Sequence, residues 1–171
     1  MLHVCSLPRM PEVVKRVRAR RLVSLLNIGT PVERPESIDE SHHLTLSMHD
    51  IVDVLPDMTP PGVAHVQNLL NFAREWDRAD AMVVHCFAGI SRSTAAAYII
   101  AAALAPRRDE AELAWQLRLA SPSATPNARL VAIADELLDR KGRMIAAIEA
   151  IGRGADAFEG EPFELVFDPQ R

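Results

Sequence analysis

The sequence predicts an α/β domain in which helices flank a central, mostly parallel sheet of four to five strands. Short apolar runs alternate with longer helical segments, which is the pattern of layered α/β domains. The short apolar run Ala81–His85 is typical of a strand buried on both faces of a parallel sheet. A length of 171 residues, of which 49% are hydrophobic, is enough for a core of its own, so residues 1–171 are expected to form a single domain.

The first half of the chain supplies three strands and one helix. Leu2–Ser6 is a short strand, and Pro11–Arg20 is an amphipathic helix with a proline in its first turn. Leu22–Asn27 is a buried strand that ends in the turn-forming sequence Ile-Gly-Thr-Pro. Apolar and polar residues alternate in His43–His49, so this run predicts a strand with one buried face.

Helices dominate the rest of the chain. Val63–Trp76 has a helical apolar stripe and follows a polar loop that contains two prolines. Further helices are expected at Ser91–Ala105, at Asp109–Ala120 and from Pro126 onward, with Thr125 as N-cap, a break at Gly142 and an end at Gly152 and Gly154. The tail 155–171 contains one apolar piece, Phe163–Phe167, to which the sequence assigns no role.

Charge and hydropathy argue against nucleic-acid and membrane partners. The net charge is −4, which gives no indication of nucleic-acid binding. The basic run Lys15–Arg21 is interpreted as a solvated helix face, with an anion or membrane patch as the alternative. Thr94–Ala105, the most apolar run, falls short of the roughly 20 residues of a membrane span and is expected to be a buried helix.

The chain has two cysteines, Cys5 and Cys86, which are too few and too far apart for a disulfide framework or a zinc site. Two thiols and an N-terminus without the features of a secretory signal favour a reducing, cytoplasmic location. His43 and His49 share a strand face but lie about 20 Å apart, so they cannot share a metal. No metal or other cofactor is expected, and the sequence does not predict an oligomeric state.

The chemistry is expected where the strand Ala81–His85 meets the next helix. This junction reads His85-Cys86-Phe87-Ala88-Gly89-Ile90-Ser91-Arg92-Ser93. A strand, a tight turn and a helix N-terminus gather backbone N–H groups around an anion, and the helix dipole adds positive potential. Cys86 lies beside these groups and beside Arg92, and each of them favours thiolate over thiol.

The spacing within this junction also has a physical reason. Arg92 offers a planar fork that matches two phosphate oxygens, and Ser93 can donate a hydrogen bond to the sulfur when the sulfur becomes a leaving group. Five residues between Cys86 and Arg92 allow the loop to curl almost into a ring. Cys86 alone reads as a buried structural cysteine. The full pattern, however, arises by chance in such a chain with a probability on the order of 10⁻⁵.

The run His85-Cys86-x5-Arg92-Ser93 resembles the signature of the protein-tyrosine-phosphatase superfamily. The order of elements before it resembles the dual-specificity branch, and the whole is similar to small bacterial tyrosine-phosphatase-like proteins. The resemblance extends from about Leu2 to Leu138 and includes the segment Arg118–Asn127, which is similar to the arginine-to-Pro-Asn segment of that branch. It implies a dual-specificity-phosphatase-like fold and a substrate that is a phosphorylated protein or a small phosphomonoester.

The resemblance also implies roles for individual residues. Cys86 would attack phosphorus and form a phosphocysteine, while Arg92 and the N–H groups of Phe87–Arg92 would hold the phosphate oxygens. An upstream aspartic acid would protonate the leaving oxygen and then act as a base on water. His85 would orient the loop from behind, and Asn127 would brace it.

Three residues compete for the role of the general acid. Asp50 lies directly at the C-terminal end of the strand His43–His49, where active sites of parallel sheets are built, and it is preferred for this reason. Asp53 is the rival because its separation from Cys86 is closer to the spacing in the branch. Asp57 is the third candidate. For each of them the alternative is a solvated loop carboxylate.

Two departures from the resembling family bear on the function. The chain has no Trp-Pro-Asp acid loop, and its one tyrosine, Tyr98, falls within a helix, which puts strict phosphotyrosine specificity in doubt. The loop carries no lysine between Cys86 and Arg92, which argues against inositol phosphates. A rhodanese-like sulfurtransferase and a catalytically weak phosphopeptide-binding module remain as alternatives. Cys5 is either a buried strand residue or a redox partner of Cys86.

Overall fold

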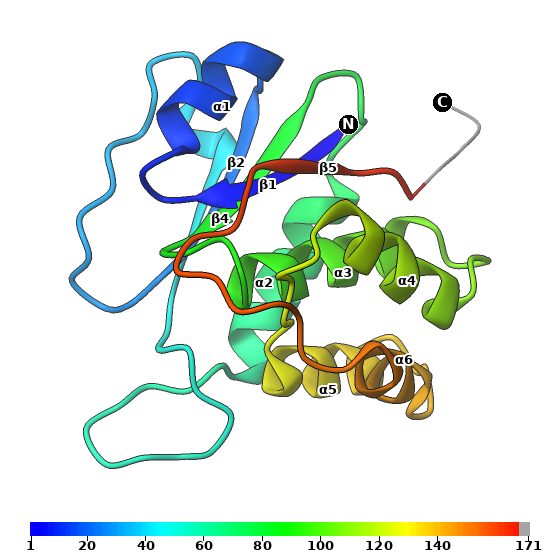
Figure 1. The fold of residues 1–171 in the computed structure, drawn as a ribbon. Helices are drawn as coiled ribbons and strands as arrows, with labels where there is room; N and C mark the ends of the chain where they lie inside the picture. Colours follow the sequence, from blue (N-terminus) through cyan, green and yellow to red (C-terminus); the bar gives the residue numbers. More distant parts are fainter. Residues whose placement is uncertain (168–171) are drawn as a thin grey trace.

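The computed structural model describes residues 1–167 as a layered α/β fold around one twisted sheet (Figure 1). The strands, in a sheet of order β3-β2-β4-β1-β5, are β1 (Leu2–Ser6), β2 (Arg21–Leu26), β3 (His43–Ser47), β4 (Met82–Cys86) and β5 (Phe163–Leu165). The strands β1 to β4 are parallel to one another, and β5 runs antiparallel to β1. The predicted α/β class and the mostly parallel sheet are confirmed.

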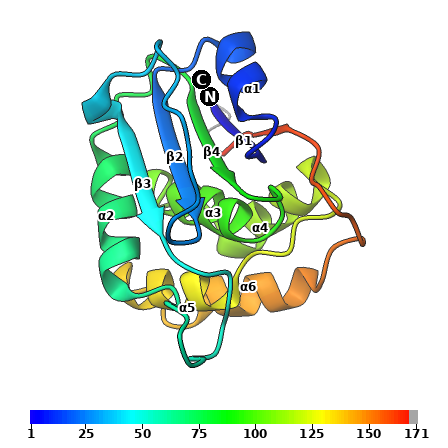
Figure 2. The same ribbon diagram turned by 90° about the vertical axis from the view of Figure 1, so that its left-hand side faces the viewer.

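Helices cover both faces of the sheet, as Figure 2 shows in side view. The helices are α1 (Met10–Val17), α2 (Val63–Arg74), α3 (Arg92–Leu104), α4 (Glu110–Ala120), α5 (Ala128–Leu137) and α6 (Arg143–Ile151), with a 3-10 turn η1 at Glu40–His42. Helix α1 packs on one face over a small apolar cluster, and α2 to α6 form the thicker layer on the other face. The main core lies between that layer and the sheet.

Helix α3 is the centre of the thicker layer. Every residue from Arg92 to Ala102 is buried, so the apolar run that follows the loop is a buried helix, as predicted. The alanines in this run let α3 approach both the sheet and its neighbouring helices closely. No helix within residues 1–167 is long and apolar enough to span a membrane.

The tail contributes a strand that the sequence did not assign. Phe163–Leu165 forms β5 on the outer edge of β1, and Leu165 and Phe167 are buried against the core. Four of the residues of the tail, 168–171, lie outside the described part of the chain. The basic side chains of the run Lys15–Arg21 are largely exposed, as expected of a solvated face, but the run is only partly helical because α1 ends at Val17.

The prediction that Thr125 caps the helix after Pro126 is wrong. Helix α5 begins two residues later than expected, and its N-cap is Asn127, whose Oδ1 accepts a hydrogen bond from Leu130 N at 3.1 Å. The backbone N–H of Thr125 instead donates to Ile90 O at 2.9 Å. The register shifts because the segment before α5 is held against the loop around Cys86.

Candidate active site

The loop from Cys86 to Arg92 lies at the carboxyl edge of the sheet, where β1, β2, β3 and β4 all end. Gly89 turns the chain with a φ of +74°, a conformation that favours glycine. A Cβ on Gly89 would lie 2.8 Å from Ser6 N and 2.9 Å from the carbonyl carbon of Cys5. The end of β1 therefore fixes the place of the loop and excludes any side chain at this position.

The carbonyl oxygens of the loop accept hydrogen bonds from donors that lie outside it. The bonds are Leu7 N to Phe87 O (3.1 Å), Gly160 N to Ala88 O (2.8 Å), Thr125 N to Ile90 O (2.9 Å) and Asn127 N to Ser91 O (3.4 Å). In a trans peptide the C=O and N–H groups point in opposite directions. These outward carbonyls therefore turn the N–H groups of residues 88, 89, 91 and 92 toward the inside of the loop.

The thiol of Cys86 lies at the base of this ring. Its residue is 2% exposed, and Sγ receives the N–H of Gly89 at 3.3 Å. The hydroxyl of Ser93, which is buried in the first turn of α3, lies 3.1 Å from the same sulfur. The sulfur thus has hydrogen-bonding partners on two sides, the N–H of Gly89 and the hydroxyl of Ser93.

Arg92 is held rigidly although it carries a charge. Its Nη1 donates to Asn27 Oδ1 at 2.8 Å and to the carbonyl of Met48 at 2.7 Å, and its side chain is 5% exposed. Its Nε is buried without a hydrogen-bond partner and lies 3.9 Å from Asp50 Oδ2. The Nη1 end of the guanidinium is therefore anchored, while Nε makes no hydrogen bond in the structure.

Asp50 is the candidate acid that the structure brings to the loop. Its Oδ1 accepts hydrogen bonds from Ser91 Oγ and from Asn127 Nδ2, both at 2.8 Å. Asp53 and Asp57 are exposed on the loop between β3 and α2, and neither lines the cavity beside Arg92. That cavity has a volume of about 360 Å³ and is lined by Leu26, Asn27, Thr30, His49, Asp50, Met58, Phe87 and Arg92.

A chain of buried polar groups supports the loop from behind. Ser24 Oγ is hydrogen-bonded to Nε2 of His85 at 2.7 Å and to Nε2 of His43 at 2.8 Å, so three neighbouring strands are joined. Burial, together with a smaller effect of the nearby His43, lowers the pKa of His85 to about 4, although a backbone hydrogen bond at Cys86 acts to raise it. His85 is thus neutral beneath the loop.

Three supporting groups were missed in the sequence. Asn27 anchors Arg92, and its position directly after a buried strand was a usable signal because strand ends converge at the site. Ser24 lies within an apolar strand, and a single polar residue there does not indicate that it is hydrogen-bonded to His85. Gly160 lies in the unassigned tail, so no local pattern links it to the loop. Within residues 1–167, no group of three or more His, Cys, Asp or Glu side chains is arranged to hold a metal.

Comparison with known proteins shows the fold to which this site belongs. The chain has a TM-score of 0.60 to PTP-2 phosphatase of Cydia pomonella, with 20% identity over 79% of this chain and 84% of the other. Its TM-score to human DUSP28 is 0.59, with 18% identity over 88% of this chain and 95% of the other. Its TM-score to the Yvh1 phosphatase domain of Chaetomium thermophilum is 0.59, with 21% identity over 84% of this chain and 93% of the other.

These likenesses identify the chain as having the dual-specificity-phosphatase fold, as the resemblance in its loop implied. No family model matches the sequence, and no curated protein matches it. At 18–21% sequence identity the comparison shows that the fold is shared and does not show the chemistry. The chemistry is therefore argued from the side chains themselves.

The arrangement of the two cysteines predicts the products of oxidation. Cys5 pairs in register with His85 and packs under α1, whereas Cys86 packs in the main core on the other face of the sheet. Burial raises the pKa of Cys5 to about 12, so it is a poor nucleophile. Mild peroxide treatment is expected to oxidise Cys86 without forming a Cys5–Cys86 bond, since side chains that point apart cannot be bridged. Non-reducing peptide mapping checks this, and a Cys5–Cys86 disulfide in the folded protein would contradict it.

The buried His85 predicts how stability depends on pH. Its pKa of about 4 in the folded chain is below the ordinary value of 6.5, so the unfolded chain binds the extra proton between these pH values. The stabilisation is complete above about pH 6.5 and is lost as the pH falls toward 4, with a slope of at most about 1.4 kcal/mol per pH unit.

Urea unfolding at pH 7, 6 and 5 checks this prediction against the variant His85→Gln, which cannot take up the proton. The wild-type free energy of unfolding should fall more steeply with decreasing pH than that of the variant. Parallel curves for the two proteins would show that His85 does not contribute.

Proposed function

We propose that this chain is a cysteine-dependent phosphomonoester hydrolase that acts through a phosphocysteine at Cys86. The observation that carries the proposal is the ring of inward N–H groups around the Cys86 sulfur, closed by the anchored guanidinium of Arg92. A phosphoryl group carries three non-bridging oxygens, and such a ring is a binding site for them. Nε of Arg92 makes no hydrogen bond in the structure and lies 3.9 Å from Asp50 Oδ2.

The residues around the ring supply two steps. In the first, the Cys86 thiolate attacks phosphorus, the bond to the leaving oxygen breaks, and Asp50 gives its proton to that oxygen. In the second, water attacks the phosphocysteine, Asp50 takes a proton from the water, and the sulfur leaves as a thiolate. The hydroxyl of Ser93, 3.1 Å from Sγ, stabilises the departing sulfur. Asn127 and Ser91 hold Asp50 in reach through both steps.

Asp50 also favours this proposal over the two alternatives. A binding module that only traps phosphopeptides has no need of a carboxylate fixed by two hydrogen bonds beside the anion ring. A sulfurtransferase of the rhodanese kind would transfer sulfur from thiosulfate to cyanide, and an assay of that reaction separates the two activities. We place the protein in the cytoplasm and propose that residues 1–171 act as one phosphatase domain.

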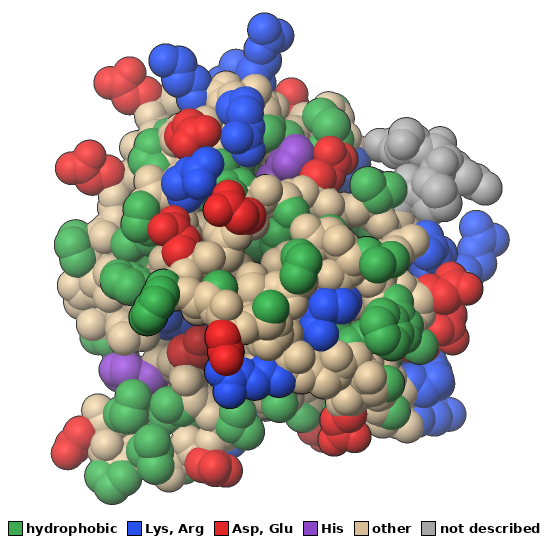
Figure 3. All heavy atoms as spheres, viewed as in Figure 1, with side chains coloured by type: hydrophobic (Ala, Val, Ile, Leu, Met, Phe, Trp, Pro, Cys, Tyr) green, Lys and Arg blue, Asp and Glu red, His purple; other side chains and the backbone are tan. Residues whose placement is uncertain are grey.

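We further propose that the substrate is a phosphorylated protein of the tyrosine or dual-specificity class. The loop between β3 and α2 protrudes beside the cavity and carries apolar side chains, as the lower part of Figure 3 shows. Val54 and Leu55 on this loop are exposed, as is Phe87 at 63%. Met58 and Phe87 line the cavity itself, so the rim is apolar where a peptide would lie. Small sugar phosphates or nucleotides would leave this surface uncovered.

Removal of the nucleophile tests the proposal most simply. Cys86→Ser is expected to abolish hydrolysis of an aryl phosphate while the thermal unfolding midpoint stays near that of the wild type. Arg92→Ala should lower kcat by about 10²–10³-fold, the usual effect of removing one donor to a developing anion. Arg92→Lys should recover little, because a point charge cannot replace the fork. A folded Cys86→Ser protein with substantial activity would refute the mechanism.

The position of Asp50 predicts the identity of the acid. Asp50→Asn should lower the rate by roughly 10²–10⁴-fold for a poor leaving group and by less for a good one. The alkaline limb of the rate profile should also disappear, because it reports loss of the proton from the acid. Asp53→Asn, a change on the same loop away from the cavity, is the matched control. It should retain both the wild-type rate and the alkaline limb of the rate profile. The assignment fails if Asp53→Asn removes the limb and Asp50→Asn keeps it.

The apolar rim predicts a substrate preference. Phosphopeptides with apolar residues beside the phosphorylated position should have a higher kcat/KM than peptides with polar ones, and Val54→Asn should narrow that difference. Aryl phosphate turnover should be unchanged in Val54→Asn. Equal rates for both peptides and faster hydrolysis of a sugar phosphate would point to a small-molecule substrate instead.

A further inference from the structure

The tail forms a strap (residues 152–162) that is fixed at both of its ends. At its start, Arg118 donates from its guanidinium to the carbonyls of Ile151 and Gly152, both at 2.8 Å. Ala155 N then donates to Pro122 O at 2.9 Å. At its end, the strap enters β5, which pairs with β1. Figure 1 shows this segment in orange and red, passing from α6 to the edge of the sheet.

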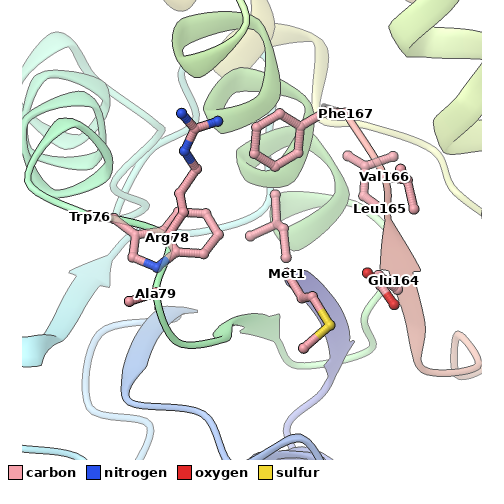
Figure 4. Close-up of a pocket in the computed structure, with 9 residues that line it drawn as sticks. Met1, Trp76, Arg78, Ala79, Glu164, Leu165, Val166 and Phe167 are labelled. Carbon is pink, nitrogen blue, oxygen red and sulfur yellow. The ribbon is translucent and has the colours of Figure 1, made fainter. Parts of the chain in front are cut away.

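The end of the strap is anchored by buried apolar side chains. Leu165 and Phe167 are nearly inaccessible. Figure 4 shows them around a cavity of about 170 Å³ that Met1 and Trp76 also line, at the opposite end of β1 from the loop. Because both ends are held, the middle of the strap has a defined position.

The middle of the strap contacts the loop at one peptide group. Gly160 N donates to Ala88 O at 2.8 Å, and the N–H on the other side of that same peptide, Gly89 N, donates to Cys86 Sγ at 3.3 Å. A peptide plane is rigid, so the bond to its carbonyl sets the direction of its N–H. Gly160 thereby aims a hydrogen bond at the nucleophile from the far side of the loop.

The contact leaves no room for a side chain on the strap. A Cβ at Gly160 would lie 2.7 Å from Gly89 O and 3.4 Å from a side-chain carbon of Ile90. The φ of Gly160 is outside the left-handed region, so alanine would be acceptable to the backbone itself. The obstacle is the carbonyl of the loop, and any added atom must push the loop or the strap aside.

A second contact holds the neighbouring strap residue. Ser6, fully buried at the end of β1, donates from its hydroxyl to a carboxylate oxygen of Glu159. Ser6 is also the residue whose backbone N would touch a Cβ on Gly89. The end of β1, the strap and the turn of the loop are therefore packed on one another.

We propose that Gly160 is a positioning residue for the Cys86 loop, and that the contact between Glu159 and Ser6 holds Gly160 at its place against Ala88. This inference rests on the proposed function, because the loop is taken to bind phosphate. The described contacts connect a segment beyond the last helix to the peptide group that faces the sulfur.

The test is Gly160→Ala in the full chain, with two readouts. The kcat for an aryl phosphate should fall about 100-fold, since small displacements of a reacting group have effects of that size. Protection of Cys86 from iodoacetamide by inorganic phosphate should weaken about tenfold, because a hydrogen bond to a charged group is misdirected. The second readout requires no turnover, so it remains informative if the wild type hydrolyses none of the substrates tried. A wild-type protein without hydrolytic activity would refute the proposed function, and the effect of Gly160→Ala on phosphate protection would then decide the role of the strap.

Two variants serve as controls. Gly62→Ala is the same substitution at the start of α2, where the new Cβ meets only His65 Nδ1 at an ordinary 3.8 Å. Phe158→Ala changes a fully exposed residue of the strap itself. Both should keep wild-type kcat and phosphate protection. The proposal is overturned if Gly160→Ala, folded at the assay temperature, equals the wild type in both readouts, or if the controls lose as much.

A gentler pair of variants decides the matter if Gly160→Ala fails to fold. Glu159→Ala removes the partner of Ser6, whereas Glu159→Gln keeps an acceptor oxygen for it. Glu159→Ala should lower kcat with little change in KM, and Glu159→Gln should restore most of the loss. Equal behaviour of the two variants would contradict the proposed role of the strap.

Discussion

The structure depends on one constraint, which is that every carbonyl of a tight loop needs a donor. The loop after β4 meets it at Phe87, Ala88, Ile90 and Ser91, whose carbonyls accept from Leu7, Gly160, Thr125 and Asn127 outside the ring. Each outward carbonyl turns the following N–H inward, so the same hydrogen bonds that satisfy the backbone also create the proposed anion site. Three segments that are distant in sequence, at Leu7, at Thr125 to Asn127 and at Gly160, are thus needed to hold the loop around the Cys86 sulfur.

The polar and charged side chains around the loop also make several contacts each. Asn127 caps α5 with its side-chain oxygen, donates to Asp50 with its side-chain nitrogen, and donates to the loop with its backbone N–H. Arg92 is bonded to the ends of β2 and β3 through Asn27 and Met48. Because parallel strands end at one edge, these side chains meet without a long excursion of the chain. Displacement of Asn127 would therefore disturb both Asp50 and the loop around Cys86.

The sequence was sufficient for the parts of the fold that repeat a local rule. The strand–loop–helix around Cys86 is contained in nine residues, and the alternation in His43–His49 correctly placed Leu46 and Met48 in the core. It also brought Asp50 rather than Asp53 into contact with the loop, because a position at a strand end is a local property, while the role of Asp50 as the acid stays a prediction. These features need no knowledge of what packs against them.

Features that depend on a distant partner were not predictable in this way. The segment before α5 offers several residues able to cap a helix, and contact with the loop, rather than propensity, selects Asn127 over Thr125. Phe163–Leu165 is too short to show a period, and it becomes a strand because the edge of β1 is available. Gly160 shows its importance only once Ala88 lies beside it.

The most direct measurement of the central claim is to trap the covalent intermediate. An acid-quenched single-turnover reaction with an aryl phosphate, followed by mass spectrometry of the peptides, should find phosphate attached to the peptide that contains Cys86, with Asp50→Asn increasing its lifetime. Phosphate on another residue, or turnover with no phosphorylated peptide at any time, would contradict a mechanism built on the sulfur at the base of the ring.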